Sequence, residues 1–471
     1  MWCIQYGYGL GVICALASHI TSSFAQGTTQ RFEAENALLS GTNVDTAQAG
    51  FSGSGYVTGF DTGTDKATFQ VSSDALTLFD VSIRYAGIYG EKRTSLVLND
   101  GSTSEVLLPA TTTWATVSGG QVLLKAGNNT IDVVSNWGWY LIDYIELTPA
   151  KARPPHQINK DLANDESGPI AYKLYNYLIS IYGKKILSGQ QDQKWVDWIT
   201  QKVGKTPALL SVDLMDYSPS RVERQGQIST AIEDAIAHHD NGGIVSVLWH
   251  WNAPNGLYDT TENPWWSGFY TRATDFDLAQ TLADPKGANY TLVIRDIDAI
   301  AIQLKRLEAA GVPVLFRPLH EAEGKWFWWG AQGPEPAKAL WKLLFDRLGE
   351  YHGLSNLVWV WNSIAEDWYP GDETVDILSA DVYAQGHGVM STQYQQLVDL
   401  GKGKKLIAAS EVGSAPKPDL LQVYKADWLW FCVWGETYID NSDWNSIEIL
   451  KEIYNSDYVL TLDEIQGWAR N

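Results

Sequence analysis

Two glutamates occur in settings that suit acid–base chemistry. Glu321 closes the run RPLHE and Glu411 closes the run AASE, each directly after a stretch of apolar residues. A single glutamate at such a place is more often a cap or an ion-pair partner than a catalyst. Two of them, each accompanied by Trp and His, favour a pair of carboxyl groups that faces one substrate. Hydrolysis of a glycosidic bond needs such a pair, because one group protonates the leaving oxygen and the other attacks the anomeric carbon.

Large aromatic residues lie near both glutamates and after other apolar runs. The chain holds 22 Trp and 23 Tyr, whose flat faces and polar edges suit sugar rings as well as protein interiors. We expect core packing to account for about half of the loop tryptophans, and stacking on a neutral polysaccharide to account for the others. The tryptophans in such positions are Trp249, Trp251, Trp265, Trp266, Trp326, Trp328, Trp329 and Trp434.

Two histidines accompany the candidate acids. His250 and His320 each follow an apolar run, which makes them candidate hydrogen-bond partners of the substrate or of a carboxylate. A zinc site of the H-E-x-x-H type is not predicted, because Gly324 stands where the second histidine would be needed.

The elements that must position these residues form a repeated pattern of strand and helix from residue 170 onwards. Eight strands followed by helical stretches favour a (β/α)8 barrel, whose chemistry lies at the carboxyl ends of its strands. On the fourth and seventh strands, Glu321 and Glu411 would project into the same mouth. An open doubly wound sheet is the competitor, but no glycine-rich phosphate loop follows any strand. The predicted strands are 185–189, 208–212, 244–248, 312–317, 357–361, 377–381, 405–409 and 429–434, and two of the predicted helices are 337–351 and 447–454.

The N-terminal part follows a different period. Between residues 30 and 148, short apolar runs of period two alternate with Gly, Asn and Asp, which predicts an all-β sandwich or jelly roll. We therefore divide the chain into a signal peptide (1–25), a β-sandwich module (26–149), a linker (150–164) and a barrel domain (165–471).

The beginning of the chain predicts secretion. Residues 10–17 are apolar but too few to span a bilayer, and small residues precede Gln26, as in a cleaved signal peptide. After its removal Cys432 is the only thiol, and its apolar neighbours predict a buried residue with no disulfide partner. Asn128 and Asn289 begin possible glycosylation sequons.

The net charge excludes one class of partner. With 34 basic against 55 acidic residues the formal charge is −21, which repels phosphate backbones, so we expect no nucleic-acid partner. No apolar stretch after the signal peptide is long enough to cross a membrane, and we expect a soluble monomer. The acidic residues are spread over both parts of the chain, which favours a role in solubility.

The run RPLHEAEGKWFWW (317–329), followed by SEVG (410–413), resembles glycoside hydrolase family 26, whose best-known members are endo-β-1,4-mannanases. The resemblance covers residues near 165 to 471. It implies Glu321 as general acid/base and Glu411 as nucleophile, and leaves Glu323 as the alternative acid. It also implies a subsite lined by His250, His320, Trp326, Asp381, Tyr383 and Trp434, with Trp265 and Trp266 at a more distant glycone subsite.

The N-terminal part is similar to family 35 carbohydrate-binding modules, in the segments FEAE (32–35) and LIDYIE (141–146). On a strand, Glu33 and Glu35 would share one face and, with Asp143, hold a structural calcium ion. Solvated edge charges explain the same spacing equally well. Asn136 and Trp137, in the loop before the last strand, are the candidate sugar contacts.

The resemblance implies a secreted, retaining endo-β-1,4-mannanase that cleaves mannan, galactomannan and glucomannan of plant cell walls, without a cofactor for catalysis. Mixed-linkage β-glucan and β-1,3-xylan remain alternative substrates. A polysaccharide-binding protein on an inactive barrel is the alternative from another class, although the intact Glu321 and Glu411 argue against it.

Overall fold

The computed structural model describes residues 28–468, except 100, 102, 152, 226–228 and 466. The predicted signal peptide (1–25) therefore lies outside the described residues. Among the helices in the described part, none is both long and apolar enough to cross a membrane.

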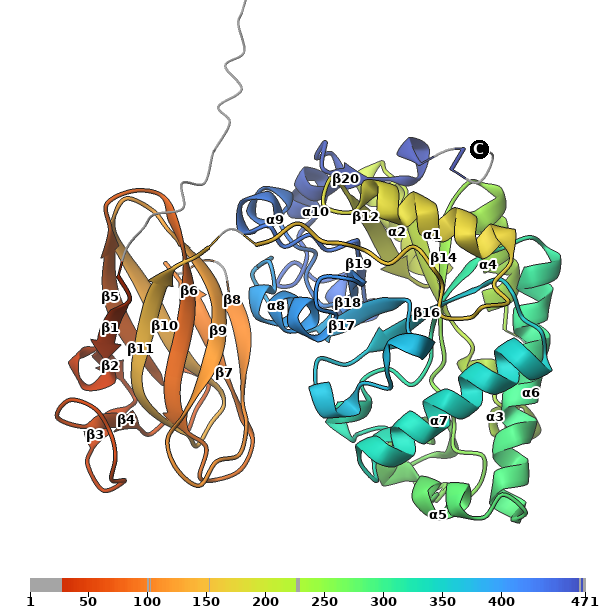
Figure 1. The fold of residues 1–471 in the computed structure, drawn as a ribbon, viewed down its shortest axis with the longest axis horizontal. Helices are drawn as coiled ribbons and strands as arrows, with labels where there is room; N and C mark the ends of the chain where they lie inside the picture. The colour runs from red at the N-terminus through yellow and green to blue at the C-terminus, as the bar shows by residue number, and fades with distance from the viewer. Residues whose placement is uncertain are drawn as a thin grey trace, which may run out of the picture.

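The N-terminal module is a sandwich of two antiparallel sheets (Figure 1). Alternate residues of its strands point inwards and form one apolar core between the sheets. The first sheet has the order β3-β4-β11-β6-β9, with β1 also paired to β11, and the second has the order β2-β5-β10-β7-β8. The strands are β1 (Gln30–Glu33), β2 (Leu38–Ser40), β3 (Asn43–Asp45), β4 (Tyr56–Thr58), β5 (Lys66–Ser73), β6 (Thr77–Ala86), β7 (Lys92–Leu98), β8 (Thr103–Leu108), β9 (Ala115–Leu124), β10 (Gly127–Trp137) and β11 (Leu141–Pro149).

The second part is a closed barrel of eight parallel strands, which confirms the predicted fold and excludes the open sheet. The barrel closes because β12, the first strand, pairs with both β13 and β19, and the short strand β20 (Val459–Leu460) adds to β12 outside the ring. Each of the eight predicted strands overlaps one observed strand. These are β12 (Ile186–Gln191), β13 (Leu209–Asp213), β14 (Ile244–Leu248), β15 (Val314–Arg317), β16 (Leu357–Asn362), β17 (Ile377–Val382), β18 (Leu406–Val412) and β19 (Trp430–Val433).

Helices surround the barrel strands in the ribbon view (Figure 1). The predicted helix 337–351 is divided, because α7 ends at Asp346 and the chain continues as a π-helical turn, η7 (Arg347–Tyr351). The α-helices are α1 (Pro169–Ile181), α2 (Gln193–Val203), α3 (Pro219–Gln225), α4 (Ala231–Asp240), α5 (Leu278–Ala283), α6 (Ala288–Ala309), α7 (Pro334–Asp346), α8 (Ser391–Leu400), α9 (Pro418–Tyr424) and α10 (Ile447–Tyr454). Short 3-10 turns are η1 (Ala34–Asn36), η2 (Met215–Tyr217), η3 (Trp265–Ser267), η4 (Thr271–Ala273), η5 (Ala322–Gly324), η6 (Trp328–Gly330), η8 (Glu366–Trp368), η9 (Asp372–Thr374), η10 (Glu436–Tyr438) and η11 (Leu462–Glu464).

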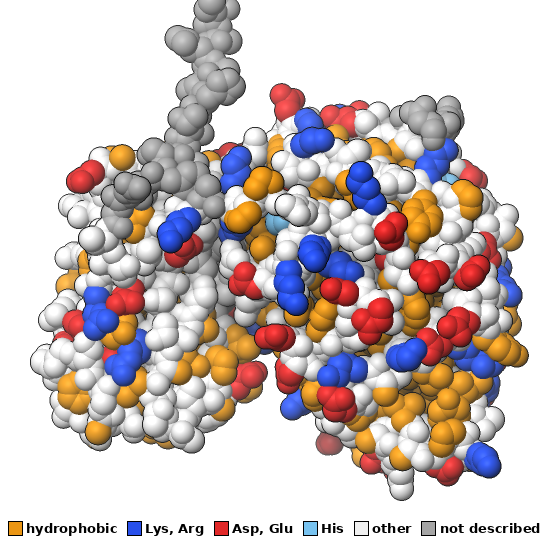
Figure 2. Space-filling view, in the orientation of Figure 1, with side chains coloured by type: hydrophobic (Ala, Val, Ile, Leu, Met, Phe, Trp, Pro, Cys, Tyr) orange, Lys and Arg blue, Asp and Glu red, His pale blue; other side chains and the backbone are white. Residues whose placement is uncertain are grey.

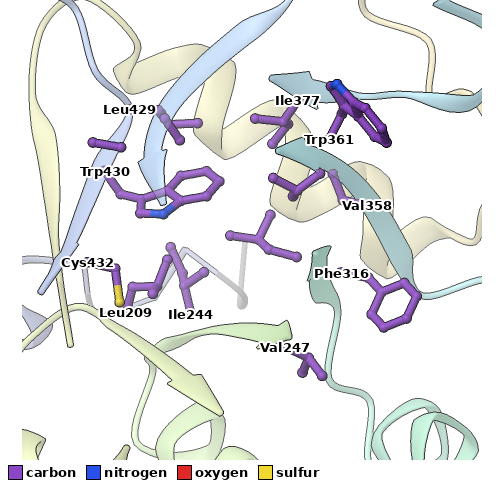
Figure 3. Packing of buried hydrophobic residues seen from close by; sticks show 14 of the residues in the cluster. Leu209, Ile244, Val247, Phe316, Val358, Trp361, Ile377, Leu429, Trp430 and Cys432 are labelled. Atoms are coloured by element: carbon purple, nitrogen blue, oxygen red, sulfur yellow. The ribbon is translucent and has the colours of Figure 1, made fainter. Parts of the chain in front are cut away.

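The barrel core is built from the strands themselves. Figure 3 shows side chains of several strands packed together, among them Leu209, Ile244, Trp430 and Cys432. Cys432 is a buried free thiol, as its apolar neighbours predict, and burial raises its pKa above the ordinary range.

Four of the loop tryptophans belong to this core and not to a sugar-binding surface. Trp249, Trp251, Trp328 and Trp329 are each at most 1% exposed, in agreement with the expectation that core packing accounts for about half of the loop tryptophans. Each indole N–H finds a partner inside the protein. The acceptors are Ser218 Oγ at 2.9 Å, Asp296 Oδ2 at 2.9 Å, the Trp251 carbonyl at 2.6 Å and the His320 carbonyl at 2.9 Å, respectively.

The module packs directly on the barrel. The Gln121 N–H donates to Ser391 Oγ at 3.0 Å, and the Leu123 N–H donates to Tyr424 Oη at 2.7 Å. Leu78 of the module is buried within the apolar cluster of the barrel. Between β11 and α1 the chain stays attached to the barrel, where the Arg153 guanidinium donates to the Lys425 carbonyl at 2.7 Å. Figure 2 shows the two bodies in contact, with acidic and basic side chains intermixed on this face of both.

Candidate active site

Glu321 is carried by a tight turn beyond the end of the fourth barrel strand. β15 ends at Arg317, and the chain then turns sharply, with φ of +54° at both Leu319 and Glu321. Left-handed backbone is unfavourable for such residues and persists only where the surroundings fix it. Here the Glu321 N–H donates to Asn362 Oδ1 at 2.9 Å, and the Trp326 Nε1–H donates to Glu321 Oε2 at the same distance. Hydrogen bonds therefore hold both the backbone N–H and the carboxyl group of Glu321 in place.

Glu411 lies within the seventh barrel strand, β18, and faces Glu321 across the mouth. The pairing of β17 with β18 shifts next to Asp381, so that Asp381 is the register partner of Glu411. Arg317 donates to Glu411 Oε2 at 2.8 Å, and the Tyr383 hydroxyl donates to Glu411 Oε1. Both carboxylate oxygens of Glu411 are thus occupied by donors that hold it in one orientation.

One buried arginine connects the carboxyl groups at the bottom of the site. Arg317 is 1% exposed and also donates to Asp381 Oδ2 at 2.6 Å. Oxygen atoms of Glu321, Asp381 and Glu411 all lie within 4.8 Å of one another, a spacing that a metal ion can bridge. The guanidinium pairs with both Asp381 and Glu411, although its single positive charge offsets only one negative charge.

The environment of Glu321 differs from that of Glu411. Burial raises the pKa of Glu321 well above its usual range, and the negative charges of Asp381 and Glu411 act in the same direction. Arg317 forms its ion pairs with the other two carboxylates, so no cation is paired with Glu321 among the described residues. Glu321 is therefore suited to carry a proton, and Glu411 to carry a charge.

Glu323, the alternative acid, is present in the same cavity. Burial raises its pKa to about 7, and its Oε1 accepts a bond of 3.3 Å from the Ile364 N–H. It is absent from the cluster of Glu321, Asp381 and Glu411, whose oxygens lie within 4.8 Å of one another. The geometry therefore favours Glu321 as the partner of Glu411.

The two histidines form a chain of hydrogen bonds with an aspartate. His250 Nδ1 lies 2.6 Å from Asp213 Oδ2, and His250 Nε2 lies 3.2 Å from His320 Nε2. Burial lowers the pKa of His320 well below its usual range, and the positive charges of His250 and Arg317 lower it further. His320 is therefore neutral, and its hydrogen-bond partner is His250 although Glu321 follows it in sequence.

Two cavities contain most of the predicted subsite residues. A cavity of about 280 Å³ is lined by Glu321, Trp326, Asp381 and Tyr383, among others. A cavity of about 530 Å³ is lined by His250 and Trp434, together with further residues after β12, β13 and β19. The structure thus places Glu321 and Trp326 in one cavity, and His250 and Trp434 in the other.

Trp265 and Trp266 lie beyond the rim of the larger cavity. Trp266 is 54% exposed, and both residues belong to η3. Arg221 connects them to the cavity, because its guanidinium pairs with Asp216, a lining residue, at 3.2 Å and lies 5.6 Å from the Trp265 ring. The exposed indole of Trp266, next to the half-buried Trp265, offers a stacking surface for one more sugar ring.

Sequence reasoning did not assign roles to three polar residues of the site. Arg317, Asn362 and Asp213 orient the two glutamates and His250 through the bonds given above. All three are the last residues of barrel strands, namely β15, β16 and β13. A polar residue at the carboxyl end of a barrel strand is itself a signal of the active face, and that signal could have identified them.

The module residues predicted to contact sugar lie at one end of β10. Trp137 is 56% exposed, with the Lys92 ammonium 4.9 Å from its ring. The side chain of Asn136 is directed towards β8, where its Nδ2 donates to Glu105 Oε2 at 3.0 Å. Trp139, which sequence reasoning missed, is 62% exposed and adopts φ of +73°.

The three predicted calcium ligands are only partly brought together. β1 ends at Glu33, and Glu35 lies in the turn η1, so the expectation that both share one face of a strand is wrong. Both carboxyl groups nevertheless lie against Gly53, and each keeps one buried oxygen without a hydrogen-bond partner among the described residues. Asp143 is instead occupied by an ion pair with Arg84 and by a 2.8 Å bond from the Ser52 N–H.

Comparisons with known proteins agree with this division of the chain. Residues 164–464 match glycosyl hydrolase family 26, and residues 30–150 match carbohydrate binding module family 35. A mannan endo-1,4-beta-mannosidase of Thermothelomyces thermophilus is 68% identical over 93% of this chain and 90% of its own length. Mannan endo-1,4-beta-mannosidase A of a Piromyces species is 34% identical over 98% of this chain and 76% of its own length.

A solved structure has the same two parts. The crystal structure of a GH26-CBM35 beta-(1,4)-mannanase of Podospora anserina is 69% identical and has a TM-score of 0.70, covering 94% of this chain and 99% of that one. Both resemblances predicted from the sequence are therefore confirmed. The chain belongs to glycosyl hydrolase family 26 and carries a family 35 carbohydrate binding module ahead of its barrel.

Proposed function

We propose that the protein is a retaining endo-β-1,4-mannanase in which Glu411 is the nucleophile and Glu321 the general acid/base. The observation that carries this proposal is the contrast between two carboxyl groups with oxygens within 4.8 Å of each other. Glu411 accepts from Arg317 and Tyr383, whereas burial and like charges raise the pKa of Glu321. A retaining enzyme needs carboxyl groups about 5 to 5.5 Å apart, whereas an inverting one needs roughly 6.5 to 9.5 Å.

In the first step Glu411 attacks the anomeric carbon and the bond to the glycosidic oxygen breaks. Glu321 gives its proton to that oxygen, so the leaving sugar departs as an alcohol. The negative charge of Glu411 is then lost in the glycosyl ester. Because that charge raises the pKa of Glu321, its loss lowers the pKa and prepares Glu321 to act as a base.

In the second step Glu321 takes a proton from water, and the water oxygen attacks the anomeric carbon. The ester bond to Glu411 breaks and its carboxylate is restored beside Arg317. The configuration of the anomeric carbon is inverted twice and is therefore retained. No metal ion is needed to supply charge in either step.

The proposed substrates are mannan, galactomannan and glucomannan of plant cell walls, acted on by a secreted monomer. The names of the relatives support mannan as the substrate class. The exposed Trp137 and Trp139 support a polysaccharide surface on the module, and Trp265 and Trp266 support a distant glycone subsite. Secretion rests on the predicted signal peptide, which lies outside the described residues.

We further propose a structural calcium ion in the module, bound through Glu33 and Glu35. Each has a buried, unpartnered carboxylate oxygen, and hard oxygen ligands suit Ca²⁺. Asp143 does not fit as a ligand while it pairs with Arg84. Its bond to the Ser52 N–H, and the 2.8 Å bond from Ser52 Oγ to Glu33, instead fix the loop that faces the two glutamates.

The function is tested with the full chain and with Glu411→Ala. We expect the wild type to release reducing sugar from galactomannan far faster than from lichenan or β-1,3-xylan, and to form the β-anomer first, as followed by NMR. Glu411→Ala should remove all measurable hydrolysis while its circular dichroism spectrum stays that of a folded protein. Retained turnover in Glu411→Ala would refute the assignment, and absence of release by the wild type would favour a binding protein.

A further inference from the structure

The cavity that contains Glu321 is not formed by the barrel alone. Arg93 of β7 and Glu105 of β8 line it from the module, opposite Glu321, Glu323 and Trp326. Its volume of about 280 Å³ lies near the lower end of the range of small-molecule sites. The binding module therefore supplies part of the wall next to the proposed general acid.

The module residues are held in place from both sides. Arg93 forms an ion pair with Glu105, and Asn136 donates to the other carboxylate oxygen of Glu105 at 3.0 Å. Across the domain boundary, Gln393 Nε2 of α8 donates to the Glu105 carbonyl at 3.3 Å. These bonds connect three module strands to the loop face of the barrel, and they fix the Arg93 guanidinium before any ligand enters.

Two oxygen atoms of the same cavity have no protein partner. Gln393 is 7% exposed, and its Oε1 and the Oε2 of Glu323 are buried without a hydrogen bond among the described residues. Burying an acceptor without a donor costs about 1 to 3 kcal/mol, so such atoms indicate a missing ligand. Arg93 adds N–H donors beyond the one that it gives to Glu105. A sugar hydroxyl group can both donate a hydrogen bond to these acceptors and accept one from these donors.

The positive charge of Arg93 in the module affects the pKa of Glu323 in the barrel domain. Burial raises the pKa of Glu323 to about 7, and the positive charge of Arg93 acts against that rise. The module cation and the barrel carboxyl group therefore form part of one electrostatic environment.

We propose that Arg93, Gln393 and Glu323 form a subsite for a backbone sugar on the leaving-group side, so that the binding module completes the catalytic cleft. The direction follows from the proposed function, on which this inference rests. The acid protonates the oxygen that departs with the leaving sugar, and Glu321 lines this cavity, whereas His250 and Trp434 line the other. Arg93 is then a specificity-determining residue located outside the catalytic domain.

The test uses full-length Arg93→Ala and Arg93→Lys with soluble substrates, where anchoring to an insoluble polymer plays no part. Mannohexaose extends into the leaving-group side, whereas an aryl β-mannobioside has a small leaving group without sugar hydroxyls. For Arg93→Ala we expect kcat/KM to fall about ten-fold on mannohexaose, as for the loss of a hydrogen bond to a charged group, and to stay unchanged on the aryl glycoside. Arg93→Lys, which keeps the charge, should fall between wild type and Arg93→Ala.

A second readout is the position of cleavage in mannohexaose, determined by mass spectrometry in heavy-oxygen water. Weaker binding on the leaving-group side should move cleavage toward the reducing end, which a general loss of stability would not do. Arg31→Ala is the matched control, because Arg31 also forms an exposed ion pair on the module, with Glu146, but does not line the cavity.

The outcomes separate this inference from the proposed function. Failure of the wild type to cleave mannohexaose would refute the proposed function itself. Cleavage by the wild type, with Arg93→Ala unchanged in rate and position, would overturn only the subsite. So would an equal loss on both substrates, or the same loss in Arg31→Ala.

Discussion

At the scale of single residues, the proposed mechanism gives one residue type two roles. Glu321 and Glu411 are chemically identical, and only their neighbours distinguish them. Arg317 and Tyr383 donate to Glu411, whereas the carboxyl group of Glu321 receives one bond, from the Trp326 indole. The sequence could suggest the pair of glutamates, and could place Arg317 at a strand end, but could not predict its two ion pairs, because these join strands that are far apart in the chain.

The assignment of the general acid is tested by comparing Glu321→Ala with Glu323→Ala. Loss of general acid catalysis costs roughly 10² to 10⁴-fold, so we expect a loss of that size on mannan for Glu321→Ala. On an aryl mannoside whose leaving group needs no proton, the first step of this variant should survive in part, as seen in a burst of released phenol. Glu323→Ala should lose less than about ten-fold on the aryl substrate. The reverse order of the two variants would transfer the role to Glu323.

At the scale of elements, the strands were predictable and the turn that carries Glu321 was not. Each barrel strand is a short run of buried apolar residues, which a pattern of hydrophobicity reports directly. The turn from Pro318 to Gly324 depends on left-handed residues and on contacts with Asn362, which no local pattern contains. In the aromatic run that follows, the sequence did not show which tryptophans are buried, for a related reason. The Trp328 N–H donates to the carbonyl of Trp251, far away in the chain, and the Trp329 N–H donates to the carbonyl of His320 within the turn itself.

A substitution at Gly330 tests how closely the turn that carries Glu321 is packed. A Cβ at this position would lie 2.0 Å from the Ala322 carbonyl oxygen, which is backbone and cannot move aside alone. We therefore expect Gly330→Ala to push the turn that carries Glu321 and to lower kcat by about 10²-fold, as for a displacement of roughly 1 Å. The protein should remain folded, with a loss of about 1 to 3 kcal/mol in the free energy of unfolding.

The matched control for this variant is Gly63→Ala in the module, where a Cβ would meet nothing within 4 Å. Kinetics on galactomannan and urea denaturation of both variants provide the comparison. Wild-type kcat in Gly330→Ala would show that the turn yields without moving Glu321.

At the scale of the whole molecule, the two parts predicted as separate units share their boundary. Leu78 of the module lies in the barrel cluster, and module amides donate to Ser391 and Tyr424 of the barrel. The sequence predicted each part by its own period, two in the module and strand-then-helix in the barrel. It contained no signal for the contact, because the sequence pattern of α8 is that of an ordinary barrel helix and does not depend on whether the helix packs on the module.

The proposed calcium ion is tested through the stability of the module. Removing Ca²⁺ with a chelator should leave Glu33 and Glu35 as neighbouring unneutralised carboxylates, and should lower the melting temperature of the full chain. Adding Ca²⁺, but not the same concentration of Na⁺, should restore it. In Glu35→Gln the response to Ca²⁺ should be lost, whereas Asp45→Asn, a module carboxylate held by backbone amides of its own turn, should keep it. A melting temperature that is insensitive to the chelator would remove the ion from the proposal.

The contact between α8 and the module sets a limit on how such proteins can be recombined. Exchanging the module for one with another ligand would replace Arg93 and Glu105 and would leave Gln393 facing a foreign surface. The chimera would therefore inherit a different cleft as well as a different anchor. A substitution on this surface of the module, at Arg93 or Glu105, therefore also changes the wall of the cavity that contains Glu321.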